Sequence, residues 1–255
     1  HLSSLGIEKS LDSKYAISKL SGEKKIKNNF NLIHSDLPSL LSKVASKNLI
    51  KQFIHISALG IESATDSNYA MSKLSGEKNV KKNFPKSVIL KPSIVYSVDD
   101  NFTTNFMSLL SKLPIMPLYY GGKTKFTPIH VSDFTDIIFN IVQKKIVGET
   151  IECVGPEVFT FKEIILKILK SINKKRILIP LPLLIAKLNA KLFQLMPNPL
   201  LTIDQLKLLK YDNIVSKKYK TNFDFKMKAN KKFDEEINLY SFNWTSGGQY
   251  SKKGF

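Results

Sequence analysis

Cysteine, arginine and long apolar runs are scarce in this 255-residue chain, and each scarcity excludes a class of structure or partner. Cys153 is the only cysteine, so no intrachain disulfide can form and a reducing compartment is favoured. Arg176 is the only arginine, which leaves little for bidentate recognition of phosphate or guanine, and we expect no nucleic-acid partner. The apolar run 178–186 is far shorter than the ~20 residues that span a bilayer.

The glycines of this chain lack the spacing that dinucleotide binding requires. The eleven glycines form neither G-x-G-x-x-G nor G-x-x-G-x-x-G, the turns in which backbone approaches a pyrophosphate. The strand that should precede such a turn and the acidic ribose ligand that should follow it are missing as well. The sequence therefore offers no phosphate-binding turn.

Positive charge, by contrast, is abundant, with a formal net charge of +18 and a pI of about 9.7. Lysine, asparagine and isoleucine are frequent throughout, which fits an A/T-rich coding bias as well as selection for a basic surface. Residues 207–232 hold nine lysines against Asp212 and Asp224. This segment is either a solvated face or an electrostatic contact with an anionic membrane or an acidic partner subunit.

One stretch of about thirty residues occurs twice. Residues 1–30 match residues 55–84 at twenty of thirty positions without a gap, and YAISKLSGEK in the first copy corresponds to YAMSKLSGEK in the second. The similarity ends after Phe30 and Phe84, whereas a solenoid continues its period for at least three units. We interpret residues 1–30 as a partial duplication, or a join between two related sequences, that forms a helical appendage.

Apolar patterning predicts alternating helices and strands around the second copy. KQFIHIS (51–57) and KSVILKPSIVY (86–96) are typical of buried strands, and LPSLLSKVASK (37–47) is typical of a helix. The second copy lies between the two strands, so residues 37–96 form a parallel crossover unit. We therefore predict an α/β fold with a parallel sheet.

The rest of the chain continues the alternation. Further helices are predicted at 101–113, 134–145, 159–172 and 181–196, and a strand at 150–155. Asp133 is expected to cap the second of these helices, and Thr160 and Glu163 have the spacing of a capping box. Cys153 is expected to be a small buried hydrophobe, and Trp244 to anchor the C-terminal tail by packing.

Three residues in and before the second copy suggest acid–base chemistry. Tyr69 and Lys73 lie one helical turn apart on the same face. A lysine ammonium near a phenol favours the phenolate and lowers the tyrosine pKa from its reference of ~10, which suits a general acid or base. Ser57 follows the preceding strand, where the active site of a parallel α/β sheet belongs.

These motifs together resemble the extended and atypical short-chain dehydrogenase/reductase superfamily. HISALG, YAMSKLSGEK, VILKPSIVY, GGKTKFTPIHVSD and the late GGQY are similar to the accessory subunit of respiratory complex I within that superfamily, which is NAD-dependent epimerase/dehydratase-like. The resemblance covers roughly residues 30–255 in one register. It implies an NAD(P)-binding Rossmann domain with a small C-terminal lobe.

The resemblance also implies roles for individual residues. Ser57, Tyr69 and Lys73 would take the catalytic positions, and Tyr69 and Lys73 would also contact the cofactor, Lys73 through the nicotinamide ribose. The run that would lie against the nicotinamide is Pro92, Ser93, Ile94 and Val95. In the complex I branch the nucleotide is thought to be structural, with no turnover known.

The missing glycine turn changes what we expect of this chain. The N-terminal half of the Rossmann domain is truncated and replaced by the duplication, so the sheet lacks its first βαβ units and exposes an edge. Residues 13–28 are expected to form a helix over part of that edge. We predict an appendage at 1–30, the remainder of the Rossmann domain at 31–150, and a mainly helical lobe with a basic tail at 151–255. Binding of NAD(P)H should be weak or absent.

The leading functional hypothesis is an accessory or assembly component of the respiratory NADH dehydrogenase without turnover. Its partners would be complex I subunits and, through the lysine-rich segment, an anionic membrane surface. It would lie in the cytoplasm, peripheral on the inner membrane, or on the matrix side of a mitochondrion. The alternatives are an active NAD(P)-dependent reductase or epimerase/dehydratase, acting on a sugar nucleotide or small carbonyl compound, and a pure scaffold fragment.

Overall fold

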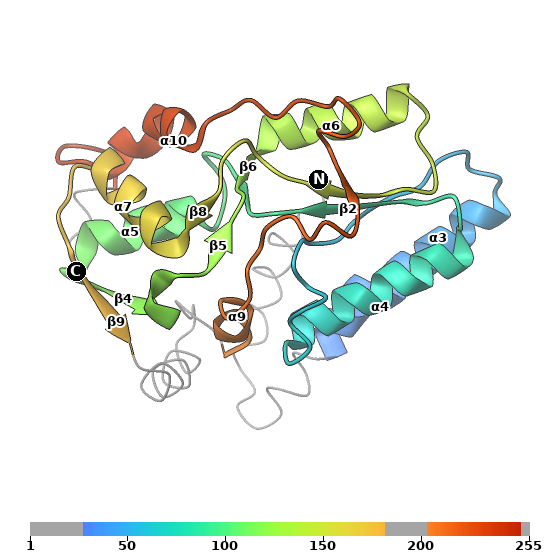
Figure 1. Ribbon diagram of the computed structural model, residues 1–255, viewed down its shortest axis with the longest axis horizontal. Helices are drawn as coiled ribbons and strands as arrows, with labels where there is room; N and C mark the ends of the chain where they lie inside the picture. The colour runs from blue at the N-terminus through green and yellow to red at the C-terminus, as the bar shows by residue number, and fades with distance from the viewer. Residues whose placement is uncertain (1–27, 182–202, 251–255) are drawn as a thin grey trace.

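A four-stranded parallel sheet forms the centre of the molecule (Figure 1). The computed structural model describes residues 28–181 and 203–250. The strands lie in the order β1 (Ile54–Ile56), β2 (Val88–Pro92), β7 (Thr150–Cys153) and β10 (Lys220–Thr221), and all neighbours pair in parallel. This arrangement confirms the predicted α/β fold with a parallel sheet.

Helices cover the two faces of the sheet, as Figure 1 shows. Helix α4 (Asn68–Asn83) connects β1 to β2 on one face, and α6 (Val131–Gln143) packs on the other. The α6 face is an apolar cluster that contains Leu90, Ile137 and Ile151. Because β2 is buried along its whole length, its sequence is an almost continuous apolar run. Lys91 is the exception, and it bears on the candidate site.

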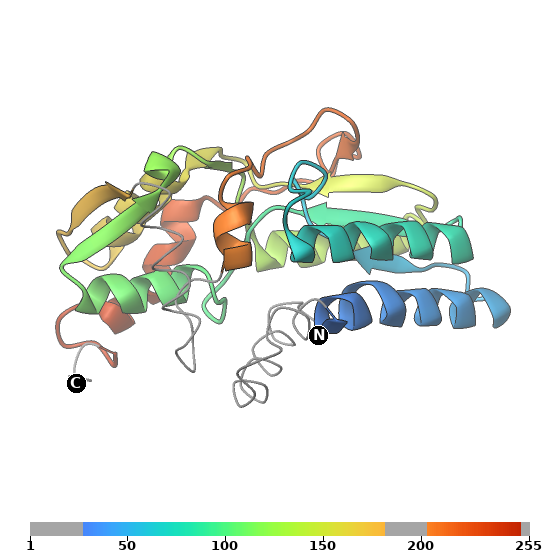
Figure 2. The same cartoon turned by 90° about the horizontal axis from the view of Figure 1, so that it is seen from below.

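Strand β1 forms one edge of the sheet and, in the described part of the chain, pairs only with β2. Helix α3 (Leu37–Lys47), which continues the π-helical segment η1 (Leu32–Asp36), runs alongside α4 (Figure 2). Its contacts with α4 are polar, and its apolar stripe is exposed through Leu37, Leu40, Leu41 and Val44. Within the described residues, the sheet therefore has an unpaired edge at β1, with the exposed apolar face of α3 beside it.

A lobe of helices and short strands lies at one end of the sheet (Figure 1). Its helical segments are α5 (Thr103–Lys112), α7 (Phe161–Ser171), α9 (Ile203–Leu208), α10 (Phe233–Ser241), η2 (Tyr120–Gly122) and η3 (Phe242–Trp244). Its strands pair as β3 (Val95–Tyr96) with β6 (Ile129–His130), β4 (Ile115–Tyr119) with β9 (Ile177–Leu181), and β5 (Lys125–Phe126) with β8 (Phe159–Thr160). A core cluster rich in aromatic side chains, including Tyr96, Phe161 and Phe233, joins these elements.

The lobe and the sheet are not separated cleanly along the chain. The boundary predicted at residue 150 falls at the first residue of β7, and both β7 and β10 belong to the central sheet. The chain leaves the sheet after β7, builds much of the lobe and returns at β10. Most of the appendage predicted at 1–30, and the predicted helices 13–28 and 181–196, fall outside the described residues. Within the described ranges, every helix is too short or too polar to cross a bilayer.

Three of the local predictions from the sequence agree with the structure, and the predicted cap of α6 does not. The Thr160–Glu163 capping box is present, Cys153 is fully buried, and Trp244 is buried with its indole N–H donating to Ser108. The prediction that Asp133 caps α6 is wrong. The helix begins at Val131, because the ring of the preceding histidine accepts the backbone N–H that a capping carboxylate would have taken.

Glycine at position 76 allows η1 to approach α4 closely. A Cβ atom at Gly76 would lie 1.8 Å from the His34 carbonyl oxygen. We expect Gly76→Ala to lower the free energy of unfolding by about 1–3 kcal/mol, since the clash exceeds the gain in helix propensity. Urea unfolding measures this. Lys78→Ala, at an exposed position of the same helix, should leave stability nearly unchanged, and an unchanged or higher midpoint for Gly76→Ala contradicts the close-packing argument.

Candidate functional site

The N-terminus of α4 is fixed by residues from two parts of the chain. Ser67 precedes the helix, and its hydroxyl accepts the backbone N–H of Ala70. The Asp204 carboxylate of α9 accepts hydrogen bonds from the Ser67 hydroxyl at 2.7 Å and from the backbone N–H of Asn68 and Tyr69 at 2.8 and 3.1 Å. A carboxylate is favourable there because the first N–H groups of a helix have no intrahelical partner.

The three residues predicted to carry chemistry come together at the carboxyl end of β1. The Ser57 backbone N–H donates to the Leu90 carbonyl at 2.7 Å, so this serine directly continues the strand pairing. Lys73 Nζ donates to the Ile56 carbonyl at 3.4 Å and lies 5.7 Å from the centroid of the Tyr69 ring. This juxtaposition agrees with the sequence pattern, and the catalytic roles stay a prediction.

Glu77 is a fourth polar residue on this face of α4, one turn beyond Lys73. The Ser57 hydroxyl donates to Glu77 Oε1 at 2.5 Å. Glu77 in turn forms an ion pair with Lys91 at 2.8 Å, and Lys91 also contacts Glu62 at 2.5 Å. The hydrogen of Ser57 therefore points toward a carboxylate of the protein.

Lys91 holds this network from inside the sheet. Its side chain has no solvent exposure, and burial by itself would lower its pKa. The charges of Glu77 and Glu62 and their hydrogen bonds outweigh that effect and raise the pKa of Lys91 above its ordinary value. The lysine therefore stays charged, as a buried cation must when carboxylates pair with it.

Two histidines, His34 and His55, lie close to Lys73 of α4. His34 of η1 packs edge-on against the Tyr69 ring at 5.1 Å, and Phe30 does so at 5.9 Å. Burial, reinforced by the positive charge of Lys73, lowers the pKa of His34 to about 3. Burial followed by the same charge lowers the pKa of His55 to about 4. Both rings are therefore neutral at physiological pH.

The run predicted to lie against a nicotinamide forms the connection from β2 to β3. Pro92 and Ser93 are buried, while Ile94 and Val95 are half-buried. The Ser93 hydroxyl donates to Asn213 Oδ1 at 2.5 Å, and Asn213 Nδ2 donates to the Leu59 carbonyl at 2.5 Å. A residue far along the chain thus ties this connection to the loop after β1.

The described residues fit only part of a dinucleotide. By the family resemblance, Tyr69, Lys73 and the β2–β3 connection would form the nicotinamide side. A pyrophosphate needs glycine backbone open to the ligand, but a Cβ at Gly60 would meet the Asp212 carbonyl at 2.8 Å and one at Gly155 would meet the Pro128 carbonyl at 1.9 Å. The protein itself packs against these two glycines, so neither offers open backbone to a pyrophosphate.

Sequence reasoning missed Glu62, Glu77, Lys91 and Asp204. A signal for two of them is visible in the chain. Lys91 is the only charged residue in the apolar strand VILKP, and Glu77 follows Tyr69 and Lys73 at positions i, i+4 and i+8 of one helix. Asp204 carries no such signal, because it is 135 residues from Tyr69.

Comparison with known proteins relates the chain to a respiratory subunit. No protein family model matches it. It is 26% identical over 213 residues to mitochondrial NADH dehydrogenase [ubiquinone] 1 alpha subcomplex subunit 9 of Mus musculus, a match that covers 82% of this chain and 56% of that one. The chain is a relative of this complex I subunit. It spans about half the length of the curated relatives it matches.

Two further likenesses concern enzymes. The chain is 32% identical over 82 residues to ceramide reductase of Caulobacter vibrioides, which covers 32% of this chain and 26% of that one. The structure of dTDP-4-dehydrorhamnose reductase from Bacillus anthracis, in complex with NADP, superposes with a TM-score of 0.58 at 15% identity over 88% of this chain and 76% of that one. The second likeness supports the predicted Rossmann-like fold.

The two buried histidines should make stability depend on pH. A pKa lowered by folding means that the unfolded chain binds more protons, so stability is full above ~6.5 and falls as pH decreases toward the folded values. As the pH falls from 7 to 5.5, we expect protonation of His34 and His55 in the unfolded chain to lower the free energy of unfolding by roughly 2 kcal/mol.

Urea unfolding across this pH range checks the expectation. His55→Phe should remove about half of the slope, since one of the two titrating rings is gone. Lys78→Ala serves as the control and should retain the full slope. A His55→Phe variant with the parental pH dependence would show that this ring does not titrate between the folded and unfolded states.

Proposed function

We propose that this chain is an accessory or assembly component of a respiratory NADH dehydrogenase and acts without turnover. The observation that carries the proposal is the likeness to a mitochondrial complex I subunit over 82% of the chain. The partners are then other subunits of that complex. The chain would then lie in the cytoplasm, peripheral on the inner membrane, or on the matrix side of a mitochondrion.

The chemistry of the site supports a role without turnover. A serine that assists a tyrosine acid must offer its hydroxyl hydrogen or lone pairs to a substrate oxygen. Here that hydrogen points to Glu77, and the rings of Phe30 and His34 pack on the Tyr69 ring. Ser57 and Tyr69 are thus engaged by groups of the protein, which supports a structural role.

The nucleotide part of the proposal concerns affinity. The family fold binds NAD(P)H, and we propose that this chain binds it weakly or not at all. The support is the absence of a glycine-rich turn from the sequence and the closed glycine positions at Gly60 and Gly155. The nicotinamide side of the site, with Ser57, Tyr69, Lys73 and the β2–β3 connection, would be the surviving part.

A titration with NADPH tests this directly. We expect fluorescence or calorimetry to show no saturation at micromolar nucleotide, because the pyrophosphate finds no backbone cradle. The Bacillus anthracis reductase, solved with NADP, is the positive control under the same conditions. Micromolar affinity of this chain would overturn the proposal on binding.

A membrane contact is the second part of the proposed setting. Exposed lysines cluster around β10 at Lys217, Lys218, Lys220, Lys226 and Lys228, and the Phe223 ring beside them is 44% exposed. Lysines near an anionic bilayer each contribute about 1 kcal/mol, and an exposed aromatic side chain suits the interface. We therefore propose that this face rests on an anionic membrane surface.

Affinity purification of the tagged chain tests the association. In its native host, we expect the chain to co-migrate with the respiratory complex on native gels and to sediment with vesicles that contain phosphatidylserine. Neutral vesicles are the control and should leave it in the supernatant, since the attraction is electrostatic. Absence from the purified complex would contradict the proposed function, and equal sedimentation with both vesicles would contradict the membrane contact alone.

An active NAD(P)-dependent reductase or epimerase/dehydratase is the second candidate. The complete Ser57, Tyr69 and Lys73 set and the local likeness to a ceramide reductase favour it. Oxidation of NADPH with a panel of sugar nucleotides and carbonyl compounds distinguishes the two candidates. Turnover that Tyr69→Phe abolishes would replace the accessory proposal with this one.

A further inference from the structure

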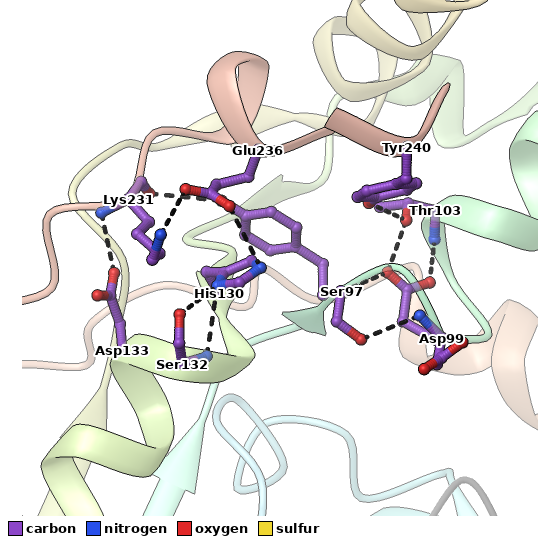
Figure 3. Close-up of polar contacts among 11 residues, drawn as sticks. Ser97, Asp99, Thr103, His130, Ser132, Asp133, Lys231, Glu236 and Tyr240 are labelled. Carbon is purple, nitrogen blue, oxygen red and sulfur yellow. Dashed lines mark hydrogen bonds and ion pairs between the residues drawn. The ribbon is translucent and has the colours of Figure 1, made fainter. Parts of the chain in front are cut away.

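A second polar cluster lies where β3, α6 and α10 meet (Figure 3). A cavity of about 360 Å³ opens there, which is at the lower end of small-molecule sites. Three apolar side chains and a set of polar groups line it: Val98, Val131 and Leu239, with Glu236, His130 and Tyr240. None of these residues belongs to the site around Ser57.

Glu236, in the first turn of α10, is the charged group of the cavity. Its side chain is only 13% exposed, and Lys231 Nζ donates to its Oε1 at 2.7 Å. Within the described residues, the nearest polar atom recorded at Oε2 is His130 Nε2, 3.6 Å away (Figure 3). That separation is too long for a hydrogen bond. One oxygen of a largely buried carboxylate is therefore available to a donor.

The hydrogen-bond pattern fixes the form of His130. The backbone N–H of Ser132 donates to His130 Nδ1 at 3.3 Å, so Nδ1 is an acceptor and the neutral ring carries its hydrogen on Nε2. Burial is the largest influence on the pKa of His130 and lowers it, with Lys231 acting in the same direction and Glu236, Asp133 and Asp100 opposing both. The imidazole is thus neutral and does not cancel the charge of Glu236.

The other polar groups of the cavity wall also present acceptors. Thr103 Oγ1 donates to Asp100 Oδ2 at 2.6 Å, so the Tyr240 hydroxyl, 2.7 Å from Thr103 Oγ1, donates its hydrogen to the threonine. The Tyr240 oxygen is left as an acceptor. Through Thr103, the Tyr240 hydroxyl is connected to the Asp100 carboxylate. The local chemistry favours a ligand that donates hydrogen bonds and carries positive charge.

The geometry points to a binding site for a small organic ammonium ion with a short apolar chain. The ammonium group donates to Glu236 Oε2, and the alkyl chain lies along Val98, Val131 and Leu239. An anion would be repelled by the Glu236 carboxylate, and the cavity is too small for a lipid with two chains. The site is independent of the proposed respiratory role.

Titration with n-hexylamine tests this site on the full chain. We expect saturable binding by calorimetry, with hexanoate, which has the same chain and the opposite charge, failing to bind. Glu236→Gln should weaken hexylamine binding by at least about tenfold, since it removes a charge-assisted hydrogen bond. Glu235→Gln is the matched control on the same helix, because Glu235 is 69% exposed and pairs only with Lys232 among the described residues; it should bind hexylamine as the parent does.

A second variant keeps the test decisive if Glu236→Gln does not fold. Leu239 is 70% exposed, so Leu239→Arg leaves the core intact while placing bulk and positive charge at the cavity. It should abolish hexylamine binding, with an unchanged thermal midpoint. The proposal is overturned if hexylamine does not saturate, if hexanoate binds as tightly, or if Leu239→Arg binds hexylamine as the parent does.

Discussion

The buried charge of Lys91 is the constraint on which the candidate site depends. A lysine without solvent exposure on the central strand is costly unless its charge is paired and its hydrogen bonds are made. Glu62 and Glu77 supply the pairing at 2.5 and 2.8 Å, and this requirement fixes the side chain of Glu77 beneath the sheet edge. Removal of one partner from such a pair typically lowers the free energy of unfolding by about 3–5 kcal/mol. The two ion pairs therefore hold the loop after β1, which carries Glu62, and the middle of α4, which carries Glu77, against β2. The orientation of Ser57 toward Glu77 follows from that arrangement.

Further contacts fix the position of helix α4, which carries part of the candidate site. Its N-terminus is held by Asp204 from α9, and its middle touches η1 at Gly76. Tyr69 and Lys73 therefore sit on a helix whose position is set by a strand, a preceding helix and a late segment of the chain. Such support from several directions suits a site that must keep its geometry.

The described sheet ends at β1 beside an apolar helix face, and this shapes how the chain can be used. Leu37, Leu40, Leu41 and Val44 of α3 are exposed at the helical spacing that normally faces a core. The unpaired strand edge next to them is a surface that natural proteins usually cover. Within the described residues, this helix face and strand edge form a surface of the kind that natural proteins usually bury against another segment or a partner.

Much of the fold follows from the sequence by itself, because the deciding interactions are local. The helix over residues 37–47, the strand runs around Ile54 and Leu90, and the capping box at Thr160 depend on periodicity and on spacings of three or four residues. The same is true of Tyr69 and Lys73 on one helix face. The α/β class and the family likeness required nothing more than these patterns.

Only the tertiary structure decided which partners these residues meet. The Ser57 hydroxyl turns to Glu77 twenty residues away, Asp204 caps a helix 135 residues earlier, and Glu236 faces His130 across the lobe. His130, rather than Asp133, caps α6, because a ring nitrogen in the right place competes with a carboxylate that instead accepts the Lys231 N–H. Linear spacing carries no information about such pairs, since burial and the return of the chain to the sheet bring them together.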